Sequence, residues 1–224
     1  MNLLAIECTH ESLSVALMSG GHVVEVCSNA WKQATETLVP LVDEVVRRQV
    51  LTPRALDALL ISSGPGSFTA LRIGMSVAKG IASGLLIPLV PVPTLPAMAR
   101  ACANEGDVII PVIRSRKGEY HHAAYGATCL NALLWHPLVF RGPIEMVLQT
   151  VQSRQGRVVV VGRHIDEVRQ AVTECGGYYV EAEAFSAQSL FPFMKVLQEQ
   201  GQTQPLAEIK PDYRQMFGPA VGRL

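Results

Sequence analysis

Three short apolar, β-branched runs at the start of the chain constrain its fold more than any other feature. They cover Leu3–Cys8, Leu13–Met18 and Val23–Cys27, and only short polar or glycine-containing connections separate them. Strands joined so closely pair as antiparallel neighbours, because a parallel crossover needs about a dozen residues or more. The sequence therefore predicts that the chain begins with a three-stranded antiparallel meander.

Helices and strands alternate after this meander. Apolar residues recur at helical spacing over Leu38–Val50, and Pro40 places the N-cap of this helix around Thr35 or Thr37, since proline is tolerated only near a helix start. The residues between 129 and 157 are predicted to be irregular. The other predicted elements are a helical turn opening at Thr52 and Pro53, strand Ala58–Ser62, a long helix ending near Gly84, strand Leu89–Val92, helix Thr94–Ala103, strands Val108–Ile113, Tyr120–Thr128 and Val158–Val161, helix Asp166–Glu174, strand Tyr178–Val180 and helix Ala187–Gln200.

This order of elements predicts an α/β architecture with mixed sheets flanked by helices. The two halves of the chain read as two lobes of related construction. The turn cluster Asn104-Glu105-Gly106 marks the boundary, which divides the chain into residues 1–104 and 105–224. Whether the residues from about Ile209 return to pack on the first lobe is left open by the sequence.

Composition and charge exclude several classes of protein. The chain is 49% hydrophobic and 17% charged, which is too apolar for a disordered segment and too poor in charge for a coiled coil. Lys plus Arg and Asp plus Glu both number 19, and each lobe is balanced, so a stand-alone tRNA-binding module is disfavoured. Five cysteines without a CxxC pair indicate reduced thiols. With no secretory signal or membrane span recognised, we expect a cytoplasmic protein.

The motif GPGSFT, at Gly64–Thr69, is the sharpest local feature. Glycines between a strand and a helix let backbone amides approach a phosphate, although the patterns of the phosphate loop, the dinucleotide loop and the nucleophile elbow all fail here. The alternative is a structural strand-to-helix turn in which Ser67 or Thr69 caps the helix.

Catalytic and metal-ligating signals are weak. The six histidines lack chelating spacing, and the adjacent His121 and His122 are expected to face opposite sides of a strand. Glu7 and Glu11 flank a turn, where they either position a magnesium ion or are solvated. No catalytic residue and no metal site are predicted. A basic turn could touch a phosphate or an acidic partner, or be a solvated hairpin tip; it contains Arg114, Arg116 and Lys117.

The helix after GPGSFT carries more apolar surface than an isolated domain needs. Its polar residues fall within an arc of about 80°, and the helix at Leu38–Val50 has an apolar arc of about 180°. Either both helices are sandwiched inside the chain, or a partner covers them. The predicted partner contacts are Leu38, Val39, Leu41, Val42, Val45, Phe68, Leu71, Arg72, Ile73, Met75, Ser76 and Val77.

Five segments together resemble the TsaB (YeaZ) family and span most of the chain. The opening LLAIECTHESLSVAL is similar to the family's LAIDTSTEALSVAL, and ATETLVPLV to its HSExLLPxI helix. The segment SSGPGSFTALRIG nearly matches the family's most specific motif, SSGPGSFTGLRIG. Further along, VIRSRKGEYHHAAY is similar to AIDARxGEVYxAxY, and PDYR, at Pro211–Arg214, to PxYLR.

The resemblance implies a two-lobed actin-like, sugar-kinase-like ATPase fold of the ribonuclease H-like type. It implies a noncatalytic subunit that lacks the paired metal histidines of its relative TsaD, pairs with TsaD through the two helices, and works with the ATPase TsaE. TsaD transfers a threonylcarbamoyl group to the adenosine beside the anticodon of tRNAs that read codons beginning with A. Alone, such a subunit is expected to form homodimers. Binding of tRNA, and of ATP or ADP with Mg²⁺, is expected only in the assembled complex.

The chain departs from the family pattern at four positions. Glu7 replaces an aspartate, Ala34 a histidine, Ala70 a glycine and Arg114 an aspartate. The first hairpin of this fold normally cradles phosphates and helps to hold a metal, so these changes weaken the case for independent nucleotide chemistry. The candidates for a vestigial phosphate or metal site are Glu7, Thr9, Gly64 and Gly66. The alternative function is a small-molecule kinase or ATPase that uses Glu7 for a metal and Gly64–Thr69 for phosphate.

Overall fold

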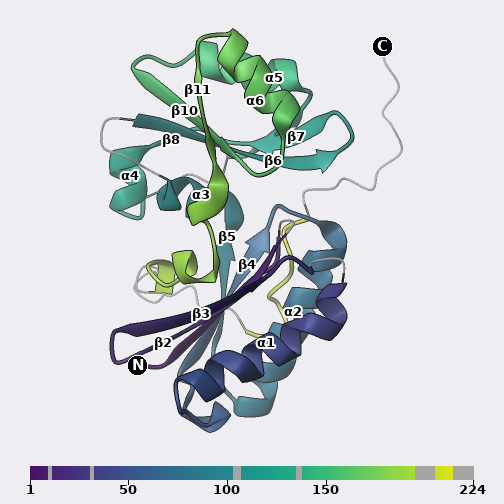
Figure 1. Ribbon diagram of the computed structural model, residues 1–224, viewed down its shortest axis with the longest axis vertical. Helices are drawn as coiled ribbons and strands as arrows, with labels where there is room; N and C mark the ends of the chain where they lie inside the picture. The colour runs from purple at the N-terminus through teal and green to yellow at the C-terminus, as the bar shows by residue number, and fades with distance from the viewer. Residues whose placement is uncertain (10–11, 31–32, 103–106, 135–137, 195–204, 214–224) are drawn as a thin grey trace.

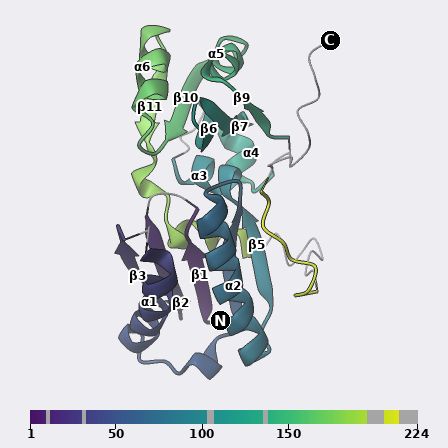
Figure 2. The ribbon, with the colours of Figure 1, turned by 90° about the vertical axis from the view of Figure 1, so that its right-hand side faces the viewer.

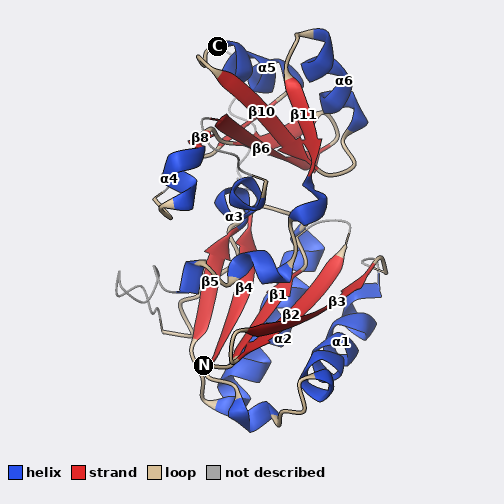
Figure 3. Cartoon of the chain, turned by 60° about the vertical axis from the view of Figure 1, so that its left-hand side comes forward, coloured by secondary structure: helices blue, strands red, loops and turns tan. Residues whose placement is uncertain are grey.

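The computed structural model describes residues 1–9, 12–30, 33–102, 107–134, 138–194 and 205–213. These residues form two lobes, one above the other in Figure 1, and each lobe is built on one β-sheet with helices packed against it. Figure 3 shows the two sheets as separate layers of strands, with short helices between them. This is the α/β architecture that the alternation of strands and helices predicts.

The first sheet confirms the antiparallel meander at the start of the chain. Its strands lie in the order β3 (His22–Ser28), β2 (Leu13–Ser19), β1 (Leu3–Glu7), β4 (Ala58–Gly64) and β5 (Leu89–Pro93). β1 pairs antiparallel with β2 and β2 with β3, whereas β1, β4 and β5 are parallel. Every residue of β1 and β4 is buried, which explains their nearly continuous apolar sequences.

The second sheet repeats this topology. Its strands lie in the order β11 (Tyr178–Glu181), β10 (Arg157–Gly162), β6 (Asp107–Arg116), β7 (Glu119–His122) and β9 (Phe140–Gly142). β6, β7 and β9 form the antiparallel part, and β6, β10 and β11 the parallel part. The two halves of the chain are therefore of related construction, as predicted.

The helices and sheets enclose three apolar clusters, one on each outer face and one between the lobes. The helices on the outer faces are α1 (Ala34–Arg48) and α2 (Phe68–Leu85) on the first sheet, and α5 (Ile144–Gln152) and α6 (Asp166–Glu174) on the second. The remaining described helices are short. They are η2 (Pro53–Ala55), between α1 and β4 in the chain, and α3 (Thr94–Ala101), α4 (Ala127–Asn131), η3 (Ala182–Ala184) and η4 (Ala187–Leu190), near the junction of the lobes. Within the described residues, no helix is long and apolar enough to span a membrane.

The predicted start of α1 is wrong. The helix begins at Ala34, and Thr37 lies inside it, where its hydroxyl donates a hydrogen bond to the Gln33 carbonyl oxygen at 2.9 Å. Pro40 therefore lies in the second turn. It has no N–H to donate to the carbonyl of Glu36, but both residues are exposed, so water can bind that carbonyl.

Three predictions in the second half need correction. The strand predicted over Tyr120–Thr128 is two strands, β7 and the short β8 (Tyr125–Gly126), which pairs with β6 in the second sheet. The second of them stops before Thr128 because Ala127 and Leu130 are buried by a helical turn, α4. The stretch predicted to be irregular contains α5 and β9. The helix predicted over Ala187–Gln200 begins as the 3-10 helix η4, and residues 195–204 lie outside the described residues.

The predicted lobe boundary at Asn104 also lies outside the described residues, so it stays a prediction. Downstream, the C-terminal segment 205–213 runs along the first lobe. The Asp212 amide donates a hydrogen bond to the Ser63 carbonyl oxygen at 2.7 Å, and Ile209 is buried in the cluster beneath α1 and α2.

Candidate interaction surface

The two outer helices of the first lobe lie side by side (Figure 2). Five of the twelve predicted partner contacts are buried within the chain, because they form the face of each helix that packs on the sheet. They are Leu38, Leu41, Val45, Leu71 and Met75. The surface that a partner could contact is therefore provided by the other seven: Val39, Val42, Phe68, Arg72, Ile73, Ser76 and Val77.

A groove of about 360 Å³ lies between the two helices. Two of the lining residues, Gly80 and Gly84, are one helical turn apart on α2, and a Cβ atom at either position would meet nothing within 4 Å. The missing side chains therefore leave the groove open. The complete lining is Val39, Val42, Asp43, Val46, Pro53, Leu56, Gly80, Ile81, Gly84 and Leu85.

Large apolar side chains are exposed around this pair of helices. Val39 of α1 is 55% exposed, and the residues that follow the ends of α1 and α2, Val50 and Leu86, are 90% and 93% exposed. Apolar surface left in water is unfavourable by about 25 cal/mol per Å², so covering it favours association. Sequence reasoning missed most of the groove lining, although the four-residue spacing of Gly80 and Gly84 was visible.

The four candidates for a phosphate or metal site meet at the carboxyl ends of β1 and β4. Glu7 is fully buried, and its Oε1 accepts hydrogen bonds from the Thr9 amide at 2.7 Å and the Thr9 hydroxyl at 2.6 Å. The Thr9 carbonyl oxygen in turn accepts a hydrogen bond from the Ser67 amide at 3.0 Å. An amide at the start of α2 that could bind a phosphate is thus engaged within the chain.

The glycines of the motif are packed tightly against other backbone segments. A Cβ atom at Gly66 would lie 2.6 Å from the Thr9 Cβ, and one at Gly64 would lie 2.4 Å from the Asp212 carbonyl oxygen. Ser67 is the N-cap of α2, and its hydroxyl accepts a hydrogen bond from the Ala70 amide. GPGSFT therefore forms a tight turn between β4 and α2 that Ser67 caps.

Arg163, which follows β10, ties the two lobes together. Its guanidinium donates hydrogen bonds to the Ser12 hydroxyl of the first hairpin and to the carbonyl oxygens of Ala182 and Phe185, at 2.7 and 2.6 Å. Glu25 of β3 adds a second connection to the segment around η4, accepting hydrogen bonds from Ser186 and Gln188. The role of Arg163 could not be predicted from the sequence, because its partners are far from it along the chain.

The predicted basic turn is partly neutralised by ion pairs. Arg114 pairs with Glu167 at 2.7 Å, and Arg116 pairs with Glu119 at 2.7 Å. The hydrogen bond from Arg116 lowers the pKa of the Glu119 carboxyl. Lys117, at the tip of the hairpin, is exposed and forms no ion pair with any residue that the structure describes.

The adjacent histidines are structural residues of the second lobe. Both are buried, and the His122 ring lies 3.0 Å from the Thr150 hydroxyl through Nε2 and stacks on Phe140. Burial lowers the pKa of His122 to about 4, so its ring is neutral at pH 7. The described part of the chain holds no group of three or more histidine, cysteine or acidic side chains that could hold a metal. Glu11 lies outside it.

Comparisons with solved structures define the class of fold. YeaZ from Pseudomonas aeruginosa superposes with a TM-score of 0.76 at 20% sequence identity, covering 95% of this chain and 99% of that one. The ethanolamine utilization protein EutJ from Carboxydothermus hydrogenoformans gives a TM-score of 0.51 at 11% identity, over 81% and 84% of the two chains. Two mixed sheets of repeated topology, flanked by helices, form an actin-like ATPase fold.

Sequence comparisons place the chain in a family. The model of the family "TsaD: tRNA N6-adenosine threonylcarbamoyltransferase" matches residues 9–129. TsaB of Escherichia coli is 28% identical over 222 residues, which cover 95% of this chain and 94% of that protein. TsaB of Haemophilus influenzae is 32% identical over 123 residues, but this match spans only 52% of its length. The chain belongs to the TsaB (YeaZ) family and contains a region that matches the TsaD family model.

Proposed function

We propose that the chain is a noncatalytic subunit in the biosynthesis of N6-threonylcarbamoyladenosine in tRNA. Its partner would be the threonylcarbamoyltransferase TsaD, which acts on the adenosine next to the anticodon, and TsaE would work with the pair. The apolar groove between α1 and α2 carries this proposal, because it offers a surface that the chain itself leaves uncovered. The similarity of the chain to TsaB and to the TsaD family model supports its place in this pathway.

The contacts around GPGSFT support a binding role over independent chemistry. The Ser67 amide is hydrogen-bonded to Thr9, Gly66 packs on Thr9, and the Arg163 guanidinium joins the first hairpin to the segment that contains η3. A nucleotide phosphate would have to break these contacts before it could bind there. The groove, by contrast, is accessible as it stands. The kinase or ATPase alternative therefore requires a rearrangement that pairing with TsaD does not.

The experiment is capture of TsaD by the chain, with both proteins taken from the same genome. Val39→Asp places a carboxylate in the apolar rim of the groove, where docking would bury it without a partner. We expect the affinity for TsaD to fall by about 100-fold or more, since an unpaired buried charge costs about 3 kcal/mol or more. The chain alone should change from a dimer to a monomer, as measured by light scattering.

Val180→Asp is the matched control. Val180 lies on β11 of the second lobe and is 40% exposed, so the same substitution is made at a similar exposure away from the groove. It should leave capture unchanged. The proposal fails if Val39→Asp and Val180→Asp bind TsaD equally well. Submicromolar binding of ATP with Mg²⁺ to the isolated chain, lost in Glu7→Ala, would instead favour the kinase alternative.

A further inference from the structure

A strip of cations lies on α2, on a face of the helix that is turned away from the groove. Arg72 is exposed and Lys79 is partly exposed, and α2 contains no acidic residue. At 100° per residue, these two side chains point within about 20° of each other and about 80° or more away from Gly80 and Gly84. A partner helix seated in the groove would therefore leave them at its edge.

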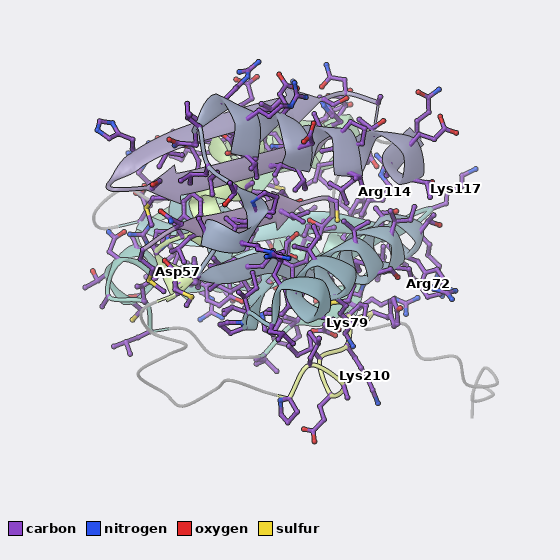
Figure 4. All side chains as sticks on the ribbon, turned by 90° about the horizontal axis from the view of Figure 1, so that it is seen from below. Asp57, Arg72, Lys79, Arg114, Lys117 and Lys210 are labelled. Carbon is purple, nitrogen blue, oxygen red and sulfur yellow. The ribbon has the colours of Figure 1, made fainter. Side chains whose placement is uncertain are left out.

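The C-terminal segment adds Lys210 to this strip. Ile209, the residue before it, is buried in the same apolar cluster as Met75 of α2, and the Tyr213 ring lies 4.8 Å from the Phe68 ring. These contacts fix the segment along α2, while Lys210 itself stays exposed. Figure 4 shows Lys210 and Lys79 on the same side of the molecule.

The hairpin between β6 and β7 extends the strip to the second lobe. Its tip lies on the same side of the molecule as the start of α2 (Figure 1), and Lys117 points outward from that side (Figure 4). Arg114 is paired with Glu167, so Lys117 supplies the uncompensated charge.

The cations of the strip form no ion pairs within the described part of the chain. They are Arg72, Lys79, Lys117 and Lys210. The Arg72 guanidinium lies 5.3 Å from the centre of the Phe68 ring, an arrangement that holds it without cancelling its charge. Glu208 is an exposed acid two residues from Lys210 and offsets part of its charge.

We infer that this strip contacts the sugar–phosphate backbone of the tRNA held by the complex. The inference rests on the proposed function. Cations on both lobes are complementary in charge to the phosphates of an RNA strand, and phosphate contacts of this kind position the nucleic acid without reading its bases. The overall neutral charge explains why such a strip would act together with TsaD and not alone.

The test compares tRNA binding by the chain–TsaD pair before and after neutralisation. The double variant Lys79→Gln, Lys210→Gln removes two charges and leaves Arg72, a predicted partner contact, unchanged; glutamine at position 79 still favours a helix. Binding should weaken about tenfold at low salt, and the slope of log affinity against log salt should fall by about two, one for each lost phosphate contact. Filter binding of labelled tRNA at about 50 to 200 mM salt measures both quantities.

Two controls separate this inference from the proposed function. Lys79→Arg keeps the charge and should bind tRNA as the native chain does, and Arg154→Gln removes an exposed cation beyond the end of α5 and should have no effect. If the double variant captures TsaD normally and its tRNA affinity and salt slope are unchanged, the inference is overturned while the proposed function stands. If it loses TsaD instead, the strip contacts the partner protein, which also overturns the inference. A native chain that never captures TsaD removes the proposed function and the inference together.

Discussion

Gly66 packs directly against the first hairpin because it has no side chain. An added Cβ atom would lie 2.6 Å from the Thr9 Cβ and 2.8 Å from the Thr9 carbonyl oxygen, so either the first hairpin or the GPGSFT turn would have to move. We predict that Gly66→Ala lowers the free energy of unfolding by about 1–3 kcal/mol, the usual cost of overpacking. Urea unfolding followed by circular dichroism measures the change.

The matched control for this prediction is Gly80→Ala, since a Cβ atom there meets nothing within 4 Å and alanine favours the helix. That variant should be unchanged or up to about 1 kcal/mol more stable. Equal stabilities for the two alanine variants would show that the Gly66 contact with Thr9 does not restrain the hairpin.

Single residues were predictable where their partners are close in sequence. The Ser67 cap follows from a serine placed just before a helix, and it forms its hydrogen bond with Ala70, three residues away. Arg163 could not be predicted in the same way, because its partner Ser12 lies 151 residues earlier. Spacing along the chain carries no information about such a contact until the fold brings the two lobes together.

At the scale of elements, the chain leaves α1 through a residue with a strained backbone conformation. Val50, just after the helix, has a φ of 54°, in the left-handed region where a β-branched side chain is strained and glycine is favoured. Because its side chain is 90% exposed, little packing would be lost on substitution. We predict that Val50→Gly raises the free energy of unfolding by about 0.5–1 kcal/mol, although the greater freedom of glycine in the unfolded chain offsets part of the gain.

Thermal unfolding of Val50→Gly and Val50→Ala checks this prediction. Alanine removes the β-branch but keeps a Cβ atom in the left-handed region, so its effect should be smaller than that of glycine. A Val50→Gly chain that melts below the native chain would mean that the valine side chain makes a stabilising contact.

Elements with a strong periodic pattern were predicted best. The three strands of the meander and α6 lie close to their predicted positions, since burial of one face imposes a clear pattern on each. The helix α5 was missed, although Val147 and Val151 are buried four residues apart, as expected for a helix packed on a sheet. The start of α1 was placed too late, because buried packing of Ala34 extends the helix beyond what Pro40 alone suggests.

At the scale of the whole molecule, the repeated topology of the two sheets was predictable from the order of the elements, but the contacts between the lobes were not. The central cluster contains residues from both sheets, such as Ala5 and Val159, and the segment from η3 to η4 passes from the second sheet to the first. These contacts depend on how two separately formed layers meet. No local pattern in the sequence encodes that geometry.

The last prediction concerns this junction. Arg163→Ala removes hydrogen bonds to both lobes and leaves the carbonyl oxygens of Ala182 and Phe185 without this donor. We expect the free energy of unfolding to fall by about 2 kcal/mol, the range for hydrogen bonds to a charged group. Hydrogen exchange should quicken at the backbone amides of η3 and η4 before it changes in α1 or α6, because the junction loosens first. Arg163→Lys should recover only part of the stability, since an ammonium group cannot reproduce the planar fork of a guanidinium. Faster exchange spread evenly over both lobes would instead mean that Arg163 stabilises the fold as a whole and does not hold the lobes together.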